Sequence, residues 1–221
     1  MLEHKKRYIQ LAFNGSAKVV ERILPTIPLH ECILIEAGTP YIKREGLAGI
    51  QLIREHWQGN IVADLKTHDG AIREVYYAHT AGATAATVSG SASVETINIF
   101  IQQCAQKNMT SMIDMLGVQE PLAILRALKH MPHVVILHRG RDEETTRGKT
   151  IPYKHINKIK SKYGVLISAA GGVDLKEACS AIFNGANIVV VNIISSGDPW
   201  TGIKETEDVA AIAQKFLRTI E

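Results

Sequence analysis

The feature that most constrains the fold of this chain is a regular alternation of short β-branched runs and longer amphipathic stretches along its whole length. Each apolar run is followed by a helical pattern, as at residues 44–54. The eight runs that we expect to be strands are 7–14, 31–37, 60–66, 84–89, 110–116, 133–138, 165–170 and 187–193. The 221 residues divided among eight units give about 28 each, enough for a strand, a helix and two short loops. The pattern predicts an α/β fold, a single-domain (β/α)₈ TIM barrel spanning residues 1–221.

A doubly wound parallel sheet is the alternative. It normally has fewer strands and a glycine-rich GxGxxG first turn, whereas the first turn here reads Phe13-Asn14-Gly15-Ser16-Ala17. Helix signals also fit the barrel, because Asp174 precedes a predicted helix at 175–183 and Asn184-Gly185 follows it. We therefore favour the barrel.

Composition and charge exclude several classes of protein. The chain is 46% hydrophobic, which suffices for a full core, but its apolar runs are far shorter than the roughly 20 residues that span a bilayer. Residues 1–7 lead into a short apolar segment without an extended signal-peptide core. We expect a cytoplasmic protein with no membrane partner. The 25 basic and 22 acidic side chains give a net charge of +3, too small and dispersed for a nucleic-acid surface.

The three cysteines, Cys32, Cys104 and Cys179, are odd in number, far apart in the sequence and in apolar surroundings. This pattern argues against a disulfide framework and against a thiolate metal site. We expect all three to be buried structural thiols.

Polar residues end many of the otherwise apolar strands. In a TIM barrel, the inward-facing side chains at the carboxyl ends of the strands meet at one opening of the barrel, which we call the mouth. Enzymes with this fold have their active sites there. Those residues are Asn14, Glu36, Asp64 with Lys66, Ser89, Asp114, His138, Gly171-Gly172 and Asn192. Any one alone could be a helix cap or a satisfied buried group. Together they predict an active site.

The densest cluster is the segment 64–70, Asp-Leu-Lys-Thr-His-Asp-Gly. Side chains alternate along a strand, so Asp64 and Lys66 share one face, and Asp69 follows on the turn into the next helix. A lysine flanked by two carboxylates stays charged, which suits it to donate a proton or to stabilise an enolate and not to form a Schiff base. The alternative is a structural ion-pair network in which Asp69 caps the helix.

Two further patterns concern ligands. Glu36 and Asp64 end adjacent strands and offer hard oxygen atoms that suit Mg²⁺, whereas no cysteine or paired-histidine spacing indicates zinc. Gly171-Gly172, after the seventh strand, leaves backbone N–H groups to face an anion such as a phosphate. The alternative for the two glycines is a simple tight turn.

These motifs resemble the orotidine monophosphate decarboxylase suprafamily, and within it hexulose-6-phosphate synthase and 3-keto-gulonate-6-phosphate decarboxylase. Asp64-x-Lys66-x-x-Asp69 is similar to the suprafamily's DxKxxD signature. The segment 35–40, Ile-Glu-Ala-Gly-Thr-Pro, followed by Glu45-Gly46, is similar to the more specific IEAGTP segment of the synthase. Asp114 and Ala170-Gly171-Gly172 also stand at positions where members of that group have equivalent residues.

The resemblance implies a Mg²⁺-dependent lyase that acts through an enediolate of a phosphorylated ketose. It places Glu36 and Asp64 at the metal, Lys66 at the reacting carbon and His138 in proton transfer. It also implies a homodimer with shared active sites, in which Asp69 serves the partner's site.

Three segments depart from the family pattern. Asn14 stands where the family usually has aspartate, and an amide cannot act as a base or as an anionic ligand. The segment 138–142, His-Arg-Gly-Arg-Asp, resembles the decarboxylase's HRSRD more than the synthase's. Asn192-Ile193 stands where the phosphate loop has glycine followed by glycine or arginine.

Three hypotheses follow. The first is 3-hexulose-6-phosphate synthase, which joins formaldehyde to ribulose 5-phosphate, because the matches at 35–40 and 64–70 are the longest. The second is 3-keto-gulonate-6-phosphate decarboxylase, in which Arg141 would hold the substrate carboxylate, unless Arg139 and Arg141 only pair with Asp142, Glu143 and Glu144 on a solvated loop. The third is a catalytically silent sugar-phosphate-binding protein, which the changes at Asn14, Asn192 and Ile193 favour. In each, Asn14, Asp114, Arg141, Gly171, Gly172, Asn192 and Ile193 are the predicted substrate-binding residues.

Overall fold

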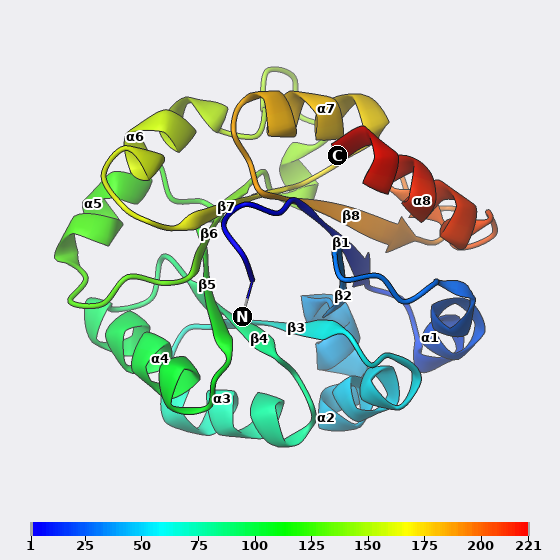
Figure 1. Cartoon of the computed structure of the whole chain (residues 1–221), viewed down its shortest axis with the longest axis horizontal. Helices are drawn as coiled ribbons and strands as arrows, with labels where there is room; N and C mark the ends of the chain where they lie inside the picture. The colour runs from blue at the N-terminus through cyan, green and yellow to red at the C-terminus, as the bar shows by residue number, and fades with distance from the viewer. Residues whose placement is uncertain (1, 221) are drawn as a thin grey trace.

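The structure, a computed structural model, describes residues 2–220, and its centre is a closed parallel barrel (Figure 1). Consecutive strands pair in chain order, and β1 also pairs with β8, so the sheet closes on itself. The barrel strands are β1 (Tyr8–Phe13), β2 (Ile33–Ala37), β3 (Asn60–Thr67), β4 (Ala85–Ser89), β5 (Thr110–Asp114), β6 (Val134–His138), β7 (Leu166–Ala170) and β8 (Ile188–Ile194). Every predicted strand is present with ends within two residues of those expected, and the predicted (β/α)₈ barrel is confirmed.

The helices form a ring outside the strands (Figure 1). They are α1 (Ala17–Ile23), α2 (Thr39–His56), α3 (Ala71–Thr80), α4 (Val94–Gln106), α5 (Pro121–Ala127), α6 (Ile156–Lys160), α7 (Leu175–Phe183) and α8 (Val209–Ile220). Short 3₁₀ helices occur at η1 (Leu24–Thr26), η2 (Arg141–Glu143) and η3 (Tyr153–His155), and a short strand β9 (Ile203–Lys204) pairs with β8. The sixth unit departs most from the expected pattern, because residues 139–155 separate β6 from α6.

The strands are buried on both faces, and alternate side chains enter two different cores. On β1, Ile9, Leu11 and Phe13 pack outward among the helices, whereas Tyr8 and Ala12 point into the barrel. Both sets are apolar because a parallel sheet covered by helices has no face in water. This burial explains the near-continuous apolar runs in the sequence.

The apolar filling of the barrel stops at the carboxyl ends of the strands. The last inward apolar positions on β2, β3, β5 and β8 are Leu34, Val62, Met112 and Val190. Two residues further along the same strands come Glu36, Asp64, Asp114 and Asn192. Because side chains alternate with a period of two, these polar groups face the same axis and form the mouth of the barrel.

The predicted ends of the seventh helix are also confirmed. Asp174 accepts a hydrogen bond from the Glu177 amide at 2.7 Å as the N-cap of α7. Gly185 follows the helix with a φ of +97°, a conformation that an L side chain rarely adopts. Within residues 2–220, no helix is both long and apolar enough to cross a membrane.

The prediction that all three cysteines are buried is wrong for Cys179. Cys104 is buried on α4 and Cys32 is half-buried, but Cys179 is exposed. Its neighbours Ala178 and Ala181 occupy the buried face of α7, so the thiol points outward. The apolar surroundings of Cys179 in the sequence gave no sign of this, because small residues supply the packing face.

We expect the exposed thiol to react first. In a thiol titration of the native protein, Cys179 should react rapidly, whereas Cys104 should react only on unfolding, because burial raises its pKa to about 12. Cys179→Ser should remove the fast phase and leave unfolding unchanged. A fast phase that survives in this variant would contradict the assignment.

Candidate active site

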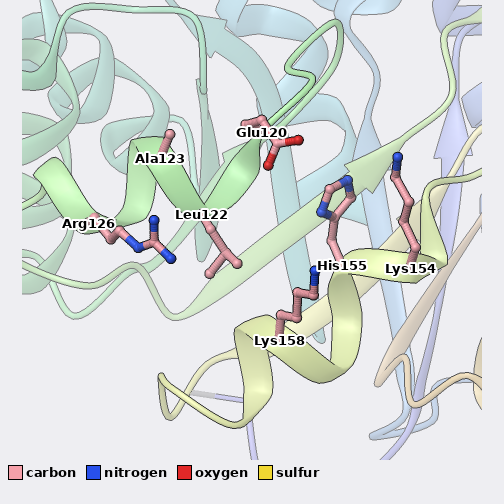
Figure 2. A pocket seen from close by; sticks show the side chains of 7 residues that line it. All are labelled: Glu120, Leu122, Ala123, Arg126, Lys154, His155 and Lys158. Atoms are coloured by element: carbon pink, nitrogen blue, oxygen red, sulfur yellow. The ribbon is translucent and has the colours of Figure 1, made fainter.

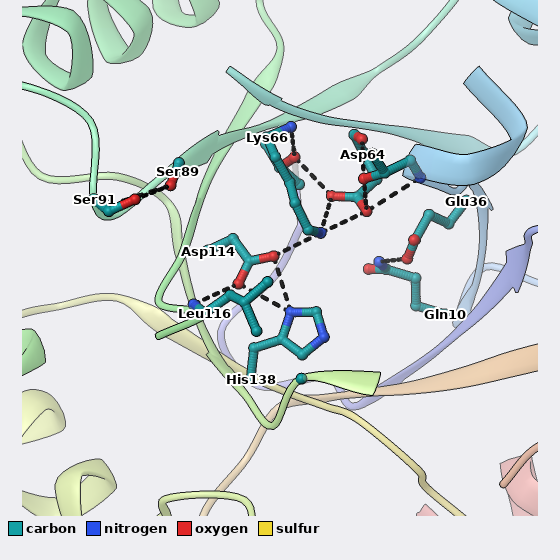
Figure 3. A network of polar contacts seen from close by, with 12 residues as sticks. Gln10, Glu36, Asp64, Lys66, Ser89, Ser91, Asp114, Leu116 and His138 are labelled. Atoms are coloured by element: carbon teal, nitrogen blue, oxygen red, sulfur yellow. Dashed lines mark hydrogen bonds and ion pairs between the residues drawn. The ribbon is translucent and has the colours of Figure 1, made fainter. Parts of the chain in front are cut away.

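The mouth of the barrel is organised around Lys66 (Figure 3). Its Nζ lies 2.7 Å from Asp64 Oδ2 and 2.8 Å from Asp114 Oδ2. The second carboxylate beside the lysine is therefore Asp114 from β5 and not Asp69, which was expected from the sequence. Asp69 is exposed on the turn before α3, where its carboxylate accepts a hydrogen bond from the Gly70 amide.

A local irregularity of β3 brings Asp64 and Lys66 together. The register against β4 shifts between Ala63 and Thr67, and Lys66 has a φ of +47°. Thr87 on β4 bridges the shift, because its hydroxyl donates to Asp64 Oδ1 at 2.8 Å and accepts from the Lys66 amide at 2.9 Å. A positive φ in a residue other than glycine is strained and is often found at functional sites.

The surroundings of Lys66 keep it charged. Burial disfavours the ammonium form, but the two carboxylates attract it more strongly, so the pKa of Lys66 rises above its ordinary value. The side chain is therefore a cation at neutral pH. It can donate a hydrogen bond or a proton to an oxygen that becomes negative, whereas Schiff-base chemistry would need a neutral amine.

Asp114 links Lys66 to His138. His138 Nδ1 lies 2.9 Å from Asp114 Oδ2, and the Leu116 amide donates to Asp114 Oδ1 at 3.0 Å. Burial alone would raise the pKa of Asp114, but His138 and Lys66 outweigh it and hold that pKa below its usual range. The pKa of His138 is raised, because Asp114 outweighs the effect of burial on the ring. With Nδ1 bound to Asp114, the ring can exchange a proton through Nε2.

Of the three carboxylates that the barrel strands place at this mouth, Glu36, Asp64 and Asp114, Glu36 is the one that has no ion pair within the described residues. It is 7% exposed and accepts a hydrogen bond from Gln10 Nε2. Burial, followed by the charge of Asp64, raises the pKa of Glu36 to about 7. A divalent cation between Glu36 and Asp64 would relieve both effects.

These donors fit Mg²⁺ in chemistry. Glu36 and Asp64 line the same cavity and present carboxylate oxygens, which hard cations prefer. No cluster of three or more histidine, cysteine or acidic side chains able to hold a metal occurs in the described part of the chain. The ion would therefore depend on substrate oxygens and water for its remaining ligands, as Mg²⁺ commonly does.

The mouth encloses a cavity of about 560 Å³. It is lined by nine predicted residues, namely Asn14, Glu36, Asp64, Lys66, Asp114, His138, Arg141, Gly171 and Asn192. Four predicted residues do not line it. Asp69 is exposed, and Gly172 is packed against the Arg139 side chain. Ile193 is buried in the outer core, and the Ser89 hydroxyl forms a hydrogen bond with that of Ser91. The side chain of Ile193 therefore cannot contact a ligand here.

The Gly171-Gly172 turn is needed by the fold as well as being suited to an anion. The two residues have φ values of +105° and +65°, and a Cβ on Gly171 would clash with the Arg139 carbonyl oxygen. Arg139 Nη2 donates to the Gly171 carbonyl oxygen at 2.8 Å. Neither glycine amide donates a hydrogen bond within residues 2–220, and Gly171 lines the cavity, so its N–H group is available there for an anion.

The loop after β6 does not form the ion pairs considered from its sequence. Glu143 pairs with Lys149 at 3.0 Å, and Glu144 accepts from the Thr201 amide. Arg141 instead stacks on Trp200, with 4.4 Å between its guanidinium carbon and the ring centroid. The stack joins the loops after β6 and β8 and holds Arg141 beside the cavity.

Asn14, which follows β1, and Asn192, on β8, both depart from the family pattern, and they contact each other. Asn14 Nδ2 donates to Asn192 Oδ1 at 3.1 Å. The register of β1 and β8 places Ala12 opposite Asn192, so the side chain that follows β1 reaches its neighbour across the seam of the barrel. Two amides here form a neutral pair.

Sequence reasoning missed several residues of the site, and four of these contact its charged groups. Gln10, Thr39, Thr87 and Trp200 bond to or stack on the acidic and basic groups described above. Gln10 and Thr87 could have been found, because each is a polar residue at an inward position of an apolar strand. Thr39 and Trp200 lie outside the barrel strands, so strand alternation says nothing about them.

Comparisons with known proteins show the family to which the chain belongs. The orotidine 5'-phosphate decarboxylase / HUMPS family matches residues 9–205. The chain is 36% identical over 215 residues to the bifunctional enzyme Fae/Hps of Methanosarcina barkeri, covering 96% of this chain and 52% of that protein. It is 40% identical over 200 residues to the Methanocaldococcus jannaschii enzyme of the same name, covering 89% and 50%. The chain thus spans about half the length of these relatives.

Solved structures show the same fold. The 3-hexulose-6-phosphate synthase of Salmonella typhimurium superimposes with a TM-score of 0.80 at 25% identity, covering 96% of this chain and 98% of that one. The 3-keto-L-gulonate-6-phosphate decarboxylase of Vibrio cholerae gives a TM-score of 0.73 at 22% identity, covering 98% of each chain.

The buried charge of Glu36 should cost stability at high pH. A carboxyl whose pKa rises from 4.5 unfolded to about 7 folded destabilises the fold as the pH increases through that interval. Without added metal, Glu36→Gln should leave the free energy of unfolding unchanged near pH 4 and raise it by roughly 3 kcal/mol at pH 8. Denaturant titrations at both pH values measure this. A variant less stable than the wild type at pH 8 would contradict it.

Proposed function

We propose a function for this chain from the premise that it belongs to the orotidine 5'-phosphate decarboxylase / HUMPS family. The function is that of a lyase acting on a phosphorylated ketose, specifically 3-hexulose-6-phosphate synthase. This enzyme joins formaldehyde to ribulose 5-phosphate and forms a hexulose phosphate. The relatives named Fae/Hps and the synthase of Salmonella typhimurium support this choice over other members of the family.

The observation that carries the proposal is the charged Lys66 held between Asp64 and Asp114 at the mouth of the barrel. A ketose becomes a carbon nucleophile when it loses a proton next to its carbonyl, which leaves an enediolate with negative charge on oxygen. A fixed ammonium in a partly buried site stabilises that charge far better than water does. Burying these charged groups costs desolvation free energy, and a protein without catalytic activity would gain nothing from it.

The proton of this reaction needs one group that both accepts and returns it. His138, oriented through Nδ1 by Asp114, is the group that we assign. In its neutral form, Nε2 accepts the proton from C1 of ribulose 5-phosphate, and the C–H electron pair enters the enediolate. The enediolate carbon then attacks the carbon of formaldehyde, and Nε2 returns the proton to the new alkoxide, so protons and electrons balance.

Glu36 and Asp64 are the residues that would hold Mg²⁺. When bound there, the ion supplies positive charge to the oxygens of the ketose. Gly171, with its free amide beside the cavity, is assigned to the phosphate. Asn14 and Asn192 offer amide donors and acceptors to the sugar hydroxyls.

A second candidate is decarboxylation of 3-keto-gulonate 6-phosphate. The position of Arg141 favours it, because Trp200 holds a guanidinium beside the cavity, where it could bind a substrate carboxylate. Formaldehyde carries no second anion. We rank the synthase first because the solved structure that bears its name matches this chain with a higher TM-score and identity, 0.80 and 25%, than the Vibrio cholerae decarboxylase does, 0.73 and 22%.

We also propose that the chain forms a homodimer with shared active sites. Asp69 lies outside the cavity of its own chain and is exposed on the turn before α3. Ile72 and Tyr76 on the same helix are exposed as well, at 58% and 51%. Asp69 is thus free to reach the site of a second copy.

The direct test is to incubate the pure protein and Mg²⁺ with ribulose 5-phosphate and formaldehyde and to follow hexulose phosphate by NMR. A parallel reaction contains 3-keto-gulonate 6-phosphate alone. Condensation supports the synthase, and carbon dioxide release supports the decarboxylase. Tight binding of ribulose 5-phosphate with neither reaction would support the silent sugar-phosphate-binding protein and contradict the enzymatic proposal.

Metal binding should depend on Glu36. Added Mg²⁺ should raise the melting temperature of the wild type and support turnover, whereas Glu36→Gln should lose the metal-dependent shift and the turnover together. Glu95→Gln, an exposed acid on α4, should behave like the wild type. Full turnover in the Glu36 variant or in excess chelator would eliminate the metal hypothesis.

The stack of Arg141 on Trp200 should discriminate between the two reactions. In a decarboxylase, Arg141→Ala should reduce kcat/KM by about 100-fold or more, because a charge-assisted bond to the carboxylate is worth about 3 kcal/mol. In a synthase the loss should be below about tenfold. Trp200→Ala should reduce kcat/KM in the same direction as Arg141→Ala but by a smaller factor. Trp200→Phe, which keeps an aromatic ring for the stack, should retain activity. Efficient decarboxylation that collapses in Arg141→Ala would show that the synthase is the wrong choice.

A further inference from the structure

A second cavity, of about 600 Å³, lies outside the barrel between α5 and α6 (Figure 2). Arg126 and Glu120 border it from the α5 side, and His155 and Lys158 border it from η3 and α6. Lys154 also contributes to the lining, and Leu122 and Ala123 add an apolar wall. Neither this cavity nor its residues take part in the proposed reaction.

The charges around this cavity are not neutralised by the protein. Within residues 2–220, Arg126, Lys154 and Lys158 form no ion pair and donate no side-chain hydrogen bond. Glu120 is the only acidic group among the lining residues. Three cations facing one concave space with one acid create a positive potential that attracts an anion.

His155 supplies an independent observation. The residue is only 6% exposed, and its imidazole ring forms no hydrogen bond within the described residues, although the ring lines the cavity. Buried polar groups are normally paired, and one that faces a cavity is available to a ligand. Burial, reinforced by Lys154, holds the pKa of His155 below its ordinary value, so the ring is neutral at pH 7 and can donate one hydrogen bond.

We propose that this cavity between α5 and α6 binds a small phosphomonoester, separately from the catalytic mouth. Arg126 and Lys158, on opposite sides of the cavity, would bind the phosphate oxygens. His155 and Glu120 would donate to and accept from hydroxyl groups on the rest of the molecule. The cavity volume lies in the range of small-molecule sites, which favours a small ligand over a flat macromolecular surface.

The cavity lies next to a further cavity on the way to the catalytic mouth, so a local reporter is needed for each. Lys154 and His155 also line a third cavity, of about 450 Å³, which reaches His138 and Arg139. The segment 148–155 lines this third cavity, and only its last two residues, Lys154 and His155, line both.

The test uses inorganic phosphate as the probe and the ring resonances of two histidines in NMR as local reporters. His155 reports on the cavity between α5 and α6, and His138 reports on the catalytic mouth, with His155→Gln assigning the first signal. We expect the His155 signal to shift to saturation as phosphate is added. In Arg126→Glu/Lys158→Glu the dissociation constant from this signal should rise at least tenfold, while the response of His138 and the catalytic activity stay unchanged.

Lys129→Glu is the matched control. Lys129 is exposed three residues beyond Arg126 but does not line the cavity, so reversing its charge should leave the His155 titration as in the wild type. The proposal is overturned if the His155 signal shows no saturable shift. It is also overturned if the double variant binds phosphate as the wild type does, or if Lys129→Glu weakens binding equally. None of these outcomes depends on whether the proposed catalytic activity is present.

Discussion

The site depends on one interaction, the contact of the buried Asp114 carboxylate with Lys66 and His138 at once. Asp114 is about 2% exposed, and a buried carboxylate is tolerated only when cations and donors surround it. The same contacts fix the position of the Lys66 ammonium and choose which nitrogen of His138 faces the cavity. Loss of Asp114 would therefore leave His138 without the partner that orients its ring and Lys66 with Asp64 as its one remaining ion-pair partner among the described residues.

The barrel makes this convergence possible with little irregular structure. The strands fill most of the interior with apolar side chains and place polar inward residues at their carboxyl ends, so β3, β5 and β6 contribute Asp64, Asp114 and His138 to one mouth. The exception is the shift in β3 that carries Lys66 with a φ of +47°. The strained backbone at Lys66 lowers the stability of the fold, and in return it places the ammonium group on which the proposed chemistry depends.

Much of the fold and part of the site were predictable. The eight strands follow from apolar periodicity, and alternation placed Asp64 and Lys66 on one face. Alternation could not show that Asp114 and not Asp69 is the second partner of Lys66, because that choice depends on distances across the barrel. The Asn14 contact with Asn192 depends on closure of the sheet, and the Arg141 stack on Trp200 depends on two loops that no local pattern places.

The central claim is that the mouth stabilises an enediolate of a phosphorylated ketose through the Lys66 arrangement. The most direct measurement is proton NMR of ribulose 5-phosphate in deuterium oxide with the protein and Mg²⁺, without formaldehyde. We predict exchange of deuterium into C1 by the wild type, and exchange slowed at least 100-fold in Asp114→Asn, which keeps the shape of the side chain and removes its charge. Absence of exchange in the wild type while the sugar phosphate stays bound, or unchanged exchange in Asp114→Asn, would contradict the claim.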